Sequence, residues 1–257
     1  MTFEPSRAWL GNEAEKESIE NYINANVVQV DGRRAIATQG PLTNSFYNFW
    51  RMVEQYKTDS IFMLCNLIEK GKIKCDRYFP QKPPNDVLTE KEYTVSFLEE
   101  EGLFKDRLRV RKLQLSNAST QQTKVITHYQ VVDWQDGEVP SKGSLKHIRY
   151  ALDQFIASMG ADSSPIVHCS AGVGRTGTFI AMAILKQQVA AQQSVSIFNE
   201  VRKLREQRWG MVHTLTQYEY LYDFTEGEID ALHNGMASLS EASSEEMKEE
   251  EGELMAI

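Results

Sequence analysis

The stretch that decides the fold is Pro165-Ile-Val-His-Cys-Ser-Ala-Gly-Val-Gly-Arg-Thr-Gly-Thr-Phe179. A short apolar run leads into Cys169, and five mostly small residues separate Cys169 from Arg175. These five residues are Ser170, Ala171, Gly172, Val173 and Gly174. Because glycine tolerates positive φ, the backbone N–H groups of such a loop can turn inward on one anion. The spacing therefore predicts a loop that holds a phosphate dianion against a thiolate.

Cys169 and Arg175 supply the chemistry that this loop predicts. Arg175 presents a planar fork that can hold two phosphate oxygens at once. The helical pattern from about Arg175 onward adds free N–H donors and partial positive charge. Helix N-termini and cations favour the ionised form of a nearby thiol, so we expect a thiolate nucleophile at Cys169. The hydroxyl of Thr176 could donate to the sulfur when the thiolate departs.

The spacing of Cys169 and Arg175 alone is weak evidence for a catalytic site, because a single cysteine is more often a buried structural residue. The complete string His-Cys-Ser-Ala-Gly-Val-Gly-Arg-Thr-Gly, residues 168–177, resembles the signature loop of the cysteine-dependent protein tyrosine phosphatases. His168 belongs to that signature. The resemblance covers about residues 3–225 and includes Asn21-Tyr-Ile-Asn-Ala25, Thr38-Gln-Gly-Pro41 and Phe49-Trp50. It implies an α/β fold with a highly twisted mixed β-sheet flanked by α-helices, and no metal or organic cofactor.

A phenol leaving group needs a proton, which a carboxylic acid can supply. In the family a mobile Trp-Pro-Asp loop before the signature cysteine carries that acid. Here Trp134-Gln135-Asp136 occupies the place, so the resemblance implies that Asp136 is the general acid and that Trp134 supports it. Asp133 lies close by and is an alternative acid. Gln135 replaces the proline and Gly137-Glu138 follows the acid, which suggests altered closure of the loop.

Two further segments match functional elements of the family. In Glu69-Lys-Gly-Lys-Ile-Lys-Cys75 the resemblance implies that Glu69 pairs with Arg175 and that Lys74 reaches Asp136; without the resemblance, this segment is only a charged hairpin turn. In the second segment, residues 205–217, Gln217 matches a glutamine that orients water for hydrolysis of the phosphocysteine. The other glutamine of that pattern is replaced by His213, which could bind the water, act as a base or be a spectator.

Strand-like and helix-like segments also favour a mixed sheet with flanking helices, because strands cluster early and helices dominate later. The expected strands are 35–38, 60–67, 73–78, 94–99, 104–114, 123–132 and 166–168. The expected helices are 45–55, 143–158, 177–191, 195–207 and 216–231. The family's tyrosine-selecting loop would fall before Met1. We therefore expect a phosphatase domain without that loop, residues 1–231, and a separate tail, residues 232–257.

The negative charge of the chain is concentrated at its C-terminal end, from Glu226 onward. The net charge is −8, but Glu226 and the residues after it hold ten acids and one lysine, whereas the preceding residues are nearly balanced. Ser238–Glu253 has no aromatic residue, and its composition predicts disorder. A solvated tail is the plainer interpretation; a basic partner, or phosphorylation of Ser243 or Ser244, is the alternative. The sequence shows no stripe of basic residues, so it gives no indication of nucleic-acid binding.

The cysteines and the N-terminus bear on location. Cys65, Cys75 and Cys169 are odd in number and lack metal-site spacing, which favours a reducing compartment. Residues 1–18 show no signal peptide, and the longest apolar run, Ile61–Cys65, is too short for a membrane span. We therefore expect a cytoplasmic protein.

The sequence leaves three classes of function to compare. The first is a phosphatase that hydrolyses phosphotyrosine on protein substrates through a phosphocysteine intermediate. The second is a phosphatase-like domain that binds phosphotyrosine peptides and turns them over poorly, as the departures at Gln135 and His213 suggest. The third is a scaffold that acts through the acidic tail. The retained nucleophile, arginine and acid favour the first.

Overall fold

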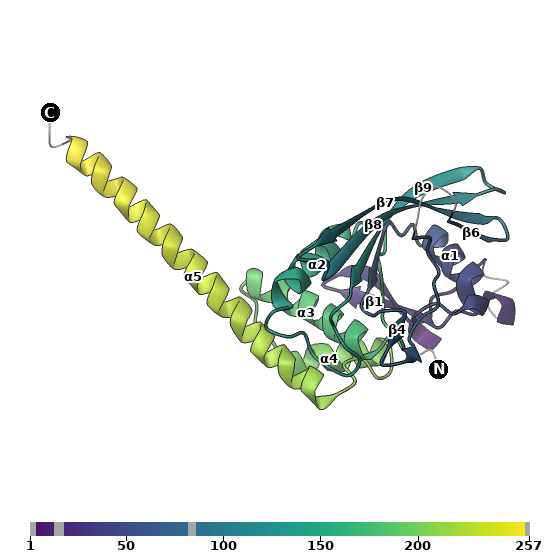
Figure 1. Cartoon of the computed structure of the whole chain (residues 1–257). Helices are drawn as coiled ribbons and strands as arrows, with labels where there is room; N and C mark the ends of the chain where they lie inside the picture. Colours follow the sequence, from purple (N-terminus) through teal and green to yellow (C-terminus); the bar gives the residue numbers. More distant parts are fainter. Residues whose placement is uncertain (1–3, 13–17, 82–85, 255–257) are drawn as a thin grey trace.

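The computed structural model describes residues 4–12, 18–81 and 86–254. Its main sheet has eight strands in the order β1-β2-β10-β3-β9-β8-β7-β6, with helices packed against it (Figure 1). The strands are β1 (Ala25–Val30), β2 (Arg33–Thr38), β3 (Ser60–Met63), β6 (Val87–Glu90), β7 (Tyr93–Leu103), β8 (Leu108–Asn117), β9 (Gln122–Val131) and β10 (Ile166–His168). The four inner strands β2, β10, β3 and β9 are parallel and the outer pairs are antiparallel, which confirms the expected mixed sheet.

The helices connect or follow these strands. They are α1 (Phe46–Gln55), α2 (Leu145–Ser158), α3 (Gly174–Ala190), α4 (Ile197–Gln207) and α5 (Leu215–Leu254), with short 3-10 turns at Glu4–Ser6, Ile19–Asn21 and Thr43–Ser45. A separate hairpin pairs β4 (Ile68–Glu69) with β5 (Lys72–Ile73). Within the described residues, no helical segment has the length and hydropathy of a transmembrane span.

The inner strands bury side chains on both faces, as expected for parallel strands covered on both sides. Phe62 and Val167 belong to one core cluster together with residues of α2, α3 and α4. Ile61 and Ile166 belong to the other cluster, which is shared with α1. This alternation follows the two-residue period of a strand. The middle strand β10 is thereby fixed in position and direction by burial on both faces.

Helix α3 begins at Gly174 rather than at Gly177, where the sequence predicts its start. Glycine disfavours a helix interior, so propensity alone places the boundary too late. Tertiary packing overrides this preference, because a Cβ on Gly177 would lie 2.4 Å from the backbone nitrogen of Val212, so only glycine lets the first turn of the helix pack against residues 211–212. The helix is buried almost all round from Arg175 to Leu185. Its N-terminus is consequently held directly against the end of β10.

Strands β1 and β6 were not predicted. Strand β1 pairs with β2 through Asp31-Gly32, and both turn residues have positive φ, 49° and 76°. Asp-Gly with this conformation is typical of a two-residue hairpin turn, so a signal was present in the sequence. Strand β6 is an edge strand with alternating half-buried and exposed residues, which gives a weak hydrophobic pattern.

The acidic segment differs from the expected disorder. Helix α5 is 40 residues long and continues through residues 232–254, so that in Figure 1 its yellow end projects away from the rest of the molecule. The physical reason lies in composition: Glu, Ala, Met and Lys are good helix formers, and no proline interrupts Ser238–Glu253. The division of the chain near residue 231 stays a prediction.

Candidate active site

Cys169 follows β10 directly and lies at the carboxyl end of the parallel strands, where ligands bind in open α/β sheets. The residue is only 2% exposed. The loop that follows it, residues 169–175, is called here the signature loop. Gly172 has a φ of 71°, and a Cβ there would lie 2.0 Å from the carbonyl oxygen of Thr38. Only glycine fits this position, as the sequence predicts for an anion-binding nest.

Hydrogen bonds from outside the signature loop hold its carbonyl groups. The N–H of Gly40 binds the carbonyl of Ser170 at 2.9 Å, and the N–H of Val212 binds the carbonyl of Val173 at 3.1 Å. In a trans peptide the N–H points opposite to the C=O, so the N–H groups of Ala171 and Gly174 face the other way. No acceptor among the described residues engages the N–H groups of residues 170–174. They are therefore available to an anion.

Arg175 is fully buried and gathers the elements of the site. Its Nη1 donates to Glu69 Oε1 at 2.6 Å and to the carbonyl of Trp134 at 2.7 Å, and its Nη2 donates to Asp136 Oδ1 at 3.3 Å. Burial alone would lower the pKa of Arg175, but the hydrogen bond to Glu69 and the Coulomb interaction with Cys169 raise it. Its Nε is buried without a partner in the described part of the chain. The Nε–H donor is thus left for a phosphate oxygen.

The acid loop, residues 133–140, folds over this arginine. Lys74 Nζ bonds to Asp136 Oδ2 at 2.6 Å, as the resemblance implies. Burial would raise the pKa of Asp136, but Lys74 and Arg175 together hold it below its ordinary value. The Trp134 indole N–H donates to the carbonyl of Glu138 at 2.8 Å and so closes the loop on itself.

Asp133, the alternative acid, has different partners. Its carboxylate accepts from the hydroxyl of Ser144 and contacts His147 Nε2, each at 2.8 Å. Both partners lie at the start of α2. Asp133 therefore fastens the acid loop to α2, whereas Asp136 contacts the arginine of the signature loop.

Gln217 and His213 occupy unequal positions. Gln217 is fully buried; its Oε1 accepts from the backbone N–H of His213 at 3.1 Å, and its Nε2 donates to the carbonyl of Glu138 at 3.3 Å. A Cβ on Gly174 would lie 3.3 Å from the side-chain amide of Gln217. The Gln217 amide thus lies between the acid loop and the signature loop. His213 is an exposed residue beside it.

The hydroxyl of Thr176 is buried, and no hydrogen-bond partner for it exists among the described residues. A buried hydroxyl of this kind costs free energy unless a ligand or an ionised neighbour uses it. This arrangement suits the donation to sulfur that the sequence predicts for Thr176.

A buried polar network behind the signature loop was not predicted. The hydroxyl of Tyr78 bonds to His168 Nε2 at 2.7 Å and to His128 Nε2 at 2.8 Å. Burial lowers the pKa of His168 to about 4 and that of His128 well below its usual value, so both rings are neutral. The signal in the sequence was the His-Tyr pair before the acid loop, but its partner Tyr78 lies in a distant segment.

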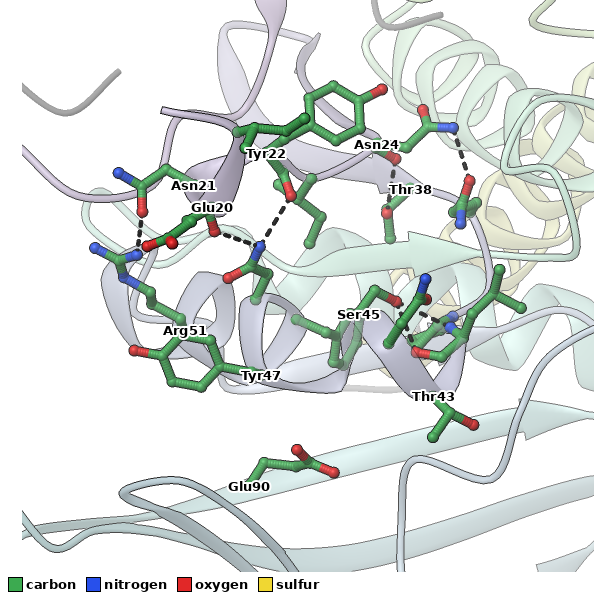
Figure 2. Close-up of a pocket in the computed structure, with 18 of the residues that line it drawn as sticks. Glu20, Asn21, Tyr22, Asn24, Thr38, Thr43, Ser45, Tyr47, Arg51 and Glu90 are labelled. Carbon is green, nitrogen blue, oxygen red and sulfur yellow. Dashed lines mark hydrogen bonds between the residues drawn. The ribbon is translucent and has the colours of Figure 1, made fainter. Parts of the chain in front are cut away.

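Two cavities lie near these residues. One, of about 460 Å³, lies between the β4–β5 hairpin and the acid loop and is lined by Lys74, Gln135 and Asp136 among others. The other, of about 820 Å³, is shown in Figure 2 and contains no residue of the signature loop. Its wall includes Asn24 and Thr38, and Thr38 contacts the signature loop from behind.

Comparisons with known proteins agree with this geometry. The family model for protein-tyrosine phosphatase matches residues 1–226. Human receptor-type tyrosine-protein phosphatase zeta is 35% identical over 231 residues, which is 87% of this chain and 10% of that protein. Human receptor-type tyrosine-protein phosphatase alpha is 35% identical over 219 residues, 84% of this chain and 26% of that protein. The chain thus spans a minor part of these relatives' length.

Solved structures give the same result. The catalytic domain of human protein tyrosine phosphatase non-receptor type 18 has a TM-score of 0.79 and 29% identity, covering 89% of this chain and 81% of that one. A structure of that protein, PTPN18, in complex with HER2-pY1196 phosphopeptides has a TM-score of 0.78 and 29% identity, covering 89% and 78%. By sequence and by structure, the chain belongs to the protein-tyrosine phosphatase family.

Proposed function

We propose that this chain is a protein-tyrosine phosphatase that hydrolyses phosphotyrosine on proteins through a phosphocysteine intermediate. The observation that carries the proposal is the combination, within residues 169–175, of a buried Cys169, five unengaged backbone N–H groups and the free Nε of Arg175. The complexes of the structural neighbour PTPN18 with phosphopeptides support a phosphotyrosine protein as substrate.

In the first step the Cys169 thiolate attacks phosphorus, and the phosphorus–oxygen bond to the tyrosine breaks. Arg175 and the loop amides hold the equatorial oxygens, where their charge opposes that of the phosphoryl group. Asp136 gives its proton to the leaving phenol oxygen. Its contacts with Lys74 and Arg175 support this role, because they hold the carboxyl group beside the arginine to which we assign phosphate binding.

In the second step water attacks phosphorus, the sulfur–phosphorus bond breaks, and Asp136 takes the proton from the water. Gln217 orients this water, and Thr176 donates to the departing sulfur. The buried position of Gln217 between the two loops supports its assignment. His213 contributes its backbone N–H to fixing Gln217, and we assign its exposed side chain no contact in the first step.

A slow trap for phosphotyrosine peptides is the second candidate, favoured by His213 at a position where the family has glutamine. If hydrolysis of the intermediate is slow, mixing the protein with an aryl phosphate should release a burst of phenol followed by slow turnover. Stopped-flow absorbance measures both phases. A burst with rapid turnover supports the enzyme, and release that stops after one equivalent supports the trap.

His213→Gln provides a direct test of the second step. Because a second amide could share the water with Gln217, we expect the steady rate after the burst to rise by about two- to tenfold, with the burst rate unchanged. His233→Gln on α5 is the matched control and should change neither phase. A steady rate that is equal or lower in His213→Gln would remove His213 from any rate-limiting role.

Gln135→Pro tests the acid loop. Proline restricts the open ensemble of a loop, which corresponds to about 0.4–1 kcal/mol of preorganisation. We therefore expect kcat for substrates with poor leaving groups to rise by about two- to fivefold. Comparing kcat for two aryl phosphates of different leaving group isolates proton donation. Equal kcat values for the variant and the parent would show that Gln135 does not limit closure.

We infer a reducing, cytoplasmic location for the described domain. Its three cysteines are free and buried, and a catalytic thiolate requires reducing conditions. For the acidic segment, residues 232–257, a solvated extension remains our proposal, with a basic partner as the alternative.

A further inference from the structure

Arg208 lies behind the signature loop and was not predicted as a functional residue. It caps the C-terminus of α4 and is 4% exposed. Its Nε donates to the carbonyl of Gly172 at 2.7 Å, and its Nη2 donates to the carbonyl of Ala171 at 3.2 Å. Two asparagines accept its other hydrogen bonds: Nη1 donates to Asn26 Oδ1 at 2.6 Å, and Nη2 also donates to Asn24 Oδ1 at 3.1 Å.

The charge of Arg208 is balanced by no carboxylate in the described part of the chain. All four acceptors are neutral carbonyl or amide oxygens. The other deeply buried arginines differ, because Arg175 pairs with Glu69 and Arg111 with Glu100. A buried cation without an anion is costly. An anion on the other side of the signature loop would offset that cost.

The contacts to Ala171 and Gly172 also set the direction of the loop amides. Since C=O and N–H are opposed in a trans peptide, drawing these two carbonyls toward Arg208 turns the next two N–H groups, of Gly172 and Val173, to the opposite side. The N–H groups of Gly40 and Val212 bind the carbonyl groups of Ser170 and Val173 and so turn the N–H groups of Ala171 and Gly174 to that same side. Arg208 therefore completes a continuous set of inward-facing donors.

We propose that Arg208 is a positioning residue of the phosphate site: it turns the amides of Gly172 and Val173 inward and supplies an uncompensated positive charge behind the bound anion. The inference deepens the proposed function and rests on it. The anions that would meet this charge are the Cys169 thiolate and the phosphate dianion.

The charged and titratable groups around Cys169 are few. Arg175, Arg208 and Cys65 interact with it electrostatically. His168 precedes it, and burial keeps that ring neutral. Burial lowers the pKa of Arg208 to about 10, and Cys169 opposes this shift, so Arg208 stays charged at neutral pH. Arg175 and Arg208 are therefore the two cations among these groups.

The first test separates the charge of Arg208 from its shape. Iodoacetamide alkylates only the thiolate, so its rate between about pH 5 and about pH 9 reports ionisation of Cys169. In Arg208→Met we expect alkylation near pH 6 to slow about tenfold, and inorganic phosphate to protect Cys169 about tenfold less well. Arg208→Lys retains the charge and should stay within about threefold of the parent in alkylation rate.

The second test cancels the charge without removing Arg208. Asn24 accepts from Arg208 and donates to Gln39 Oε1 at 2.7 Å, and it lies at one end of the cavity in Figure 2. Asn24→Asp places a carboxylate against Arg208, and the Gln39 amide can turn to donate to it. We expect slower alkylation and weaker phosphate protection, each by about threefold or more, with an unchanged or higher Tm. Asn44→Asp, an exposed residue on the same cavity, is the matched control and should change neither.

Two results would contradict the positioning role of Arg208. Equal losses in Arg208→Met and Arg208→Lys, or an Asn24→Asp protein with the alkylation profile of the parent, would show that Arg208 is only structural. Thermal melting identifies a variant that does not fold, and if Arg208→Met fails to fold, the comparison of Asn24→Asp with Asn44→Asp decides alone. Neither readout needs turnover, so a parent protein that binds phosphate but releases none would contradict the proposed activity without affecting this test.

Discussion

Replacing Cys169 with serine is expected to lower the rate of phosphate release from an aryl phosphate by at least about 10⁴-fold. A serine hydroxyl fits the same buried space, but it does not ionise near neutral pH and is a poor nucleophile without a base. His168 does not supply such a base, because its Nε2 is bonded to the hydroxyl of Tyr78, its Nδ1 faces the carbonyl of Cys169, and burial lowers its pKa to about 4. Release of inorganic phosphate under steady-state conditions is the measurement.

Cys75→Ser is the matched control for that experiment. Cys75 is as buried as Cys169, and its Sγ contacts the carbonyl of Pro41 at 3.5 Å, a bond that a hydroxyl can replace. Burial raises the pKa of the Cys75 thiol far above neutrality, so it is not a thiolate. We expect Cys75→Ser to retain activity within about threefold. If the unaltered protein is no faster than Cys169→Ser, the chain is a binding module and phosphotyrosine capture is its function.

The part of the site that could be predicted is the part coded in one short segment. Cys169 and Arg175 are six positions apart on a strand–loop–helix unit, so their proximity follows from local geometry. The pairs Glu69–Arg175 and Lys74–Asp136 join distant segments. No spacing argument predicts them, and only the family resemblance placed them together.

The residues that the sequence did not predict either bind backbone groups of the signature loop or lie on its far side from the proposed phosphate site. Arg208 and Gly40 bind carbonyl groups of the signature loop, and their own sequence context is an ordinary helix end and a turn. Tyr78 meets His128 and His168 only because three separate segments converge. Sequence patterns report periodicity and local motifs, whereas such contacts depend on tertiary packing. The length of α5 was missed for a different reason, because composition indicates both solvation and helix propensity in an acidic segment.

The second large effect is expected for Asp136→Asn, which removes the proposed general acid and keeps a side chain of the same shape. For aryl phosphates with poor leaving groups, kcat should fall by about 10²–10⁴-fold, with a smaller loss for good leaving groups. The same variant should also change the pH dependence of the reaction. Lys74 and Arg175 hold the pKa of Asp136 below its ordinary value, so this carboxyl group is ionised before substrate binds.

The reacting complex must nevertheless contain one proton for the leaving phenol, and the substrate can bring it. Phosphate monoesters take up a proton with a pKa of about 6, and a dianion bound at Arg175 opposes ionisation of Asp136. The parent kcat/KM should therefore fall about tenfold per pH unit above about pH 6. In Asp136→Asn the proton has no acceptor, and this alkaline fall should disappear. Asp133→Asn, which alters the contacts with α2 and with Arg107 but leaves Asp136 in place, should keep it. An Asp136→Asn profile with the parental slope would transfer the role of acid to another group.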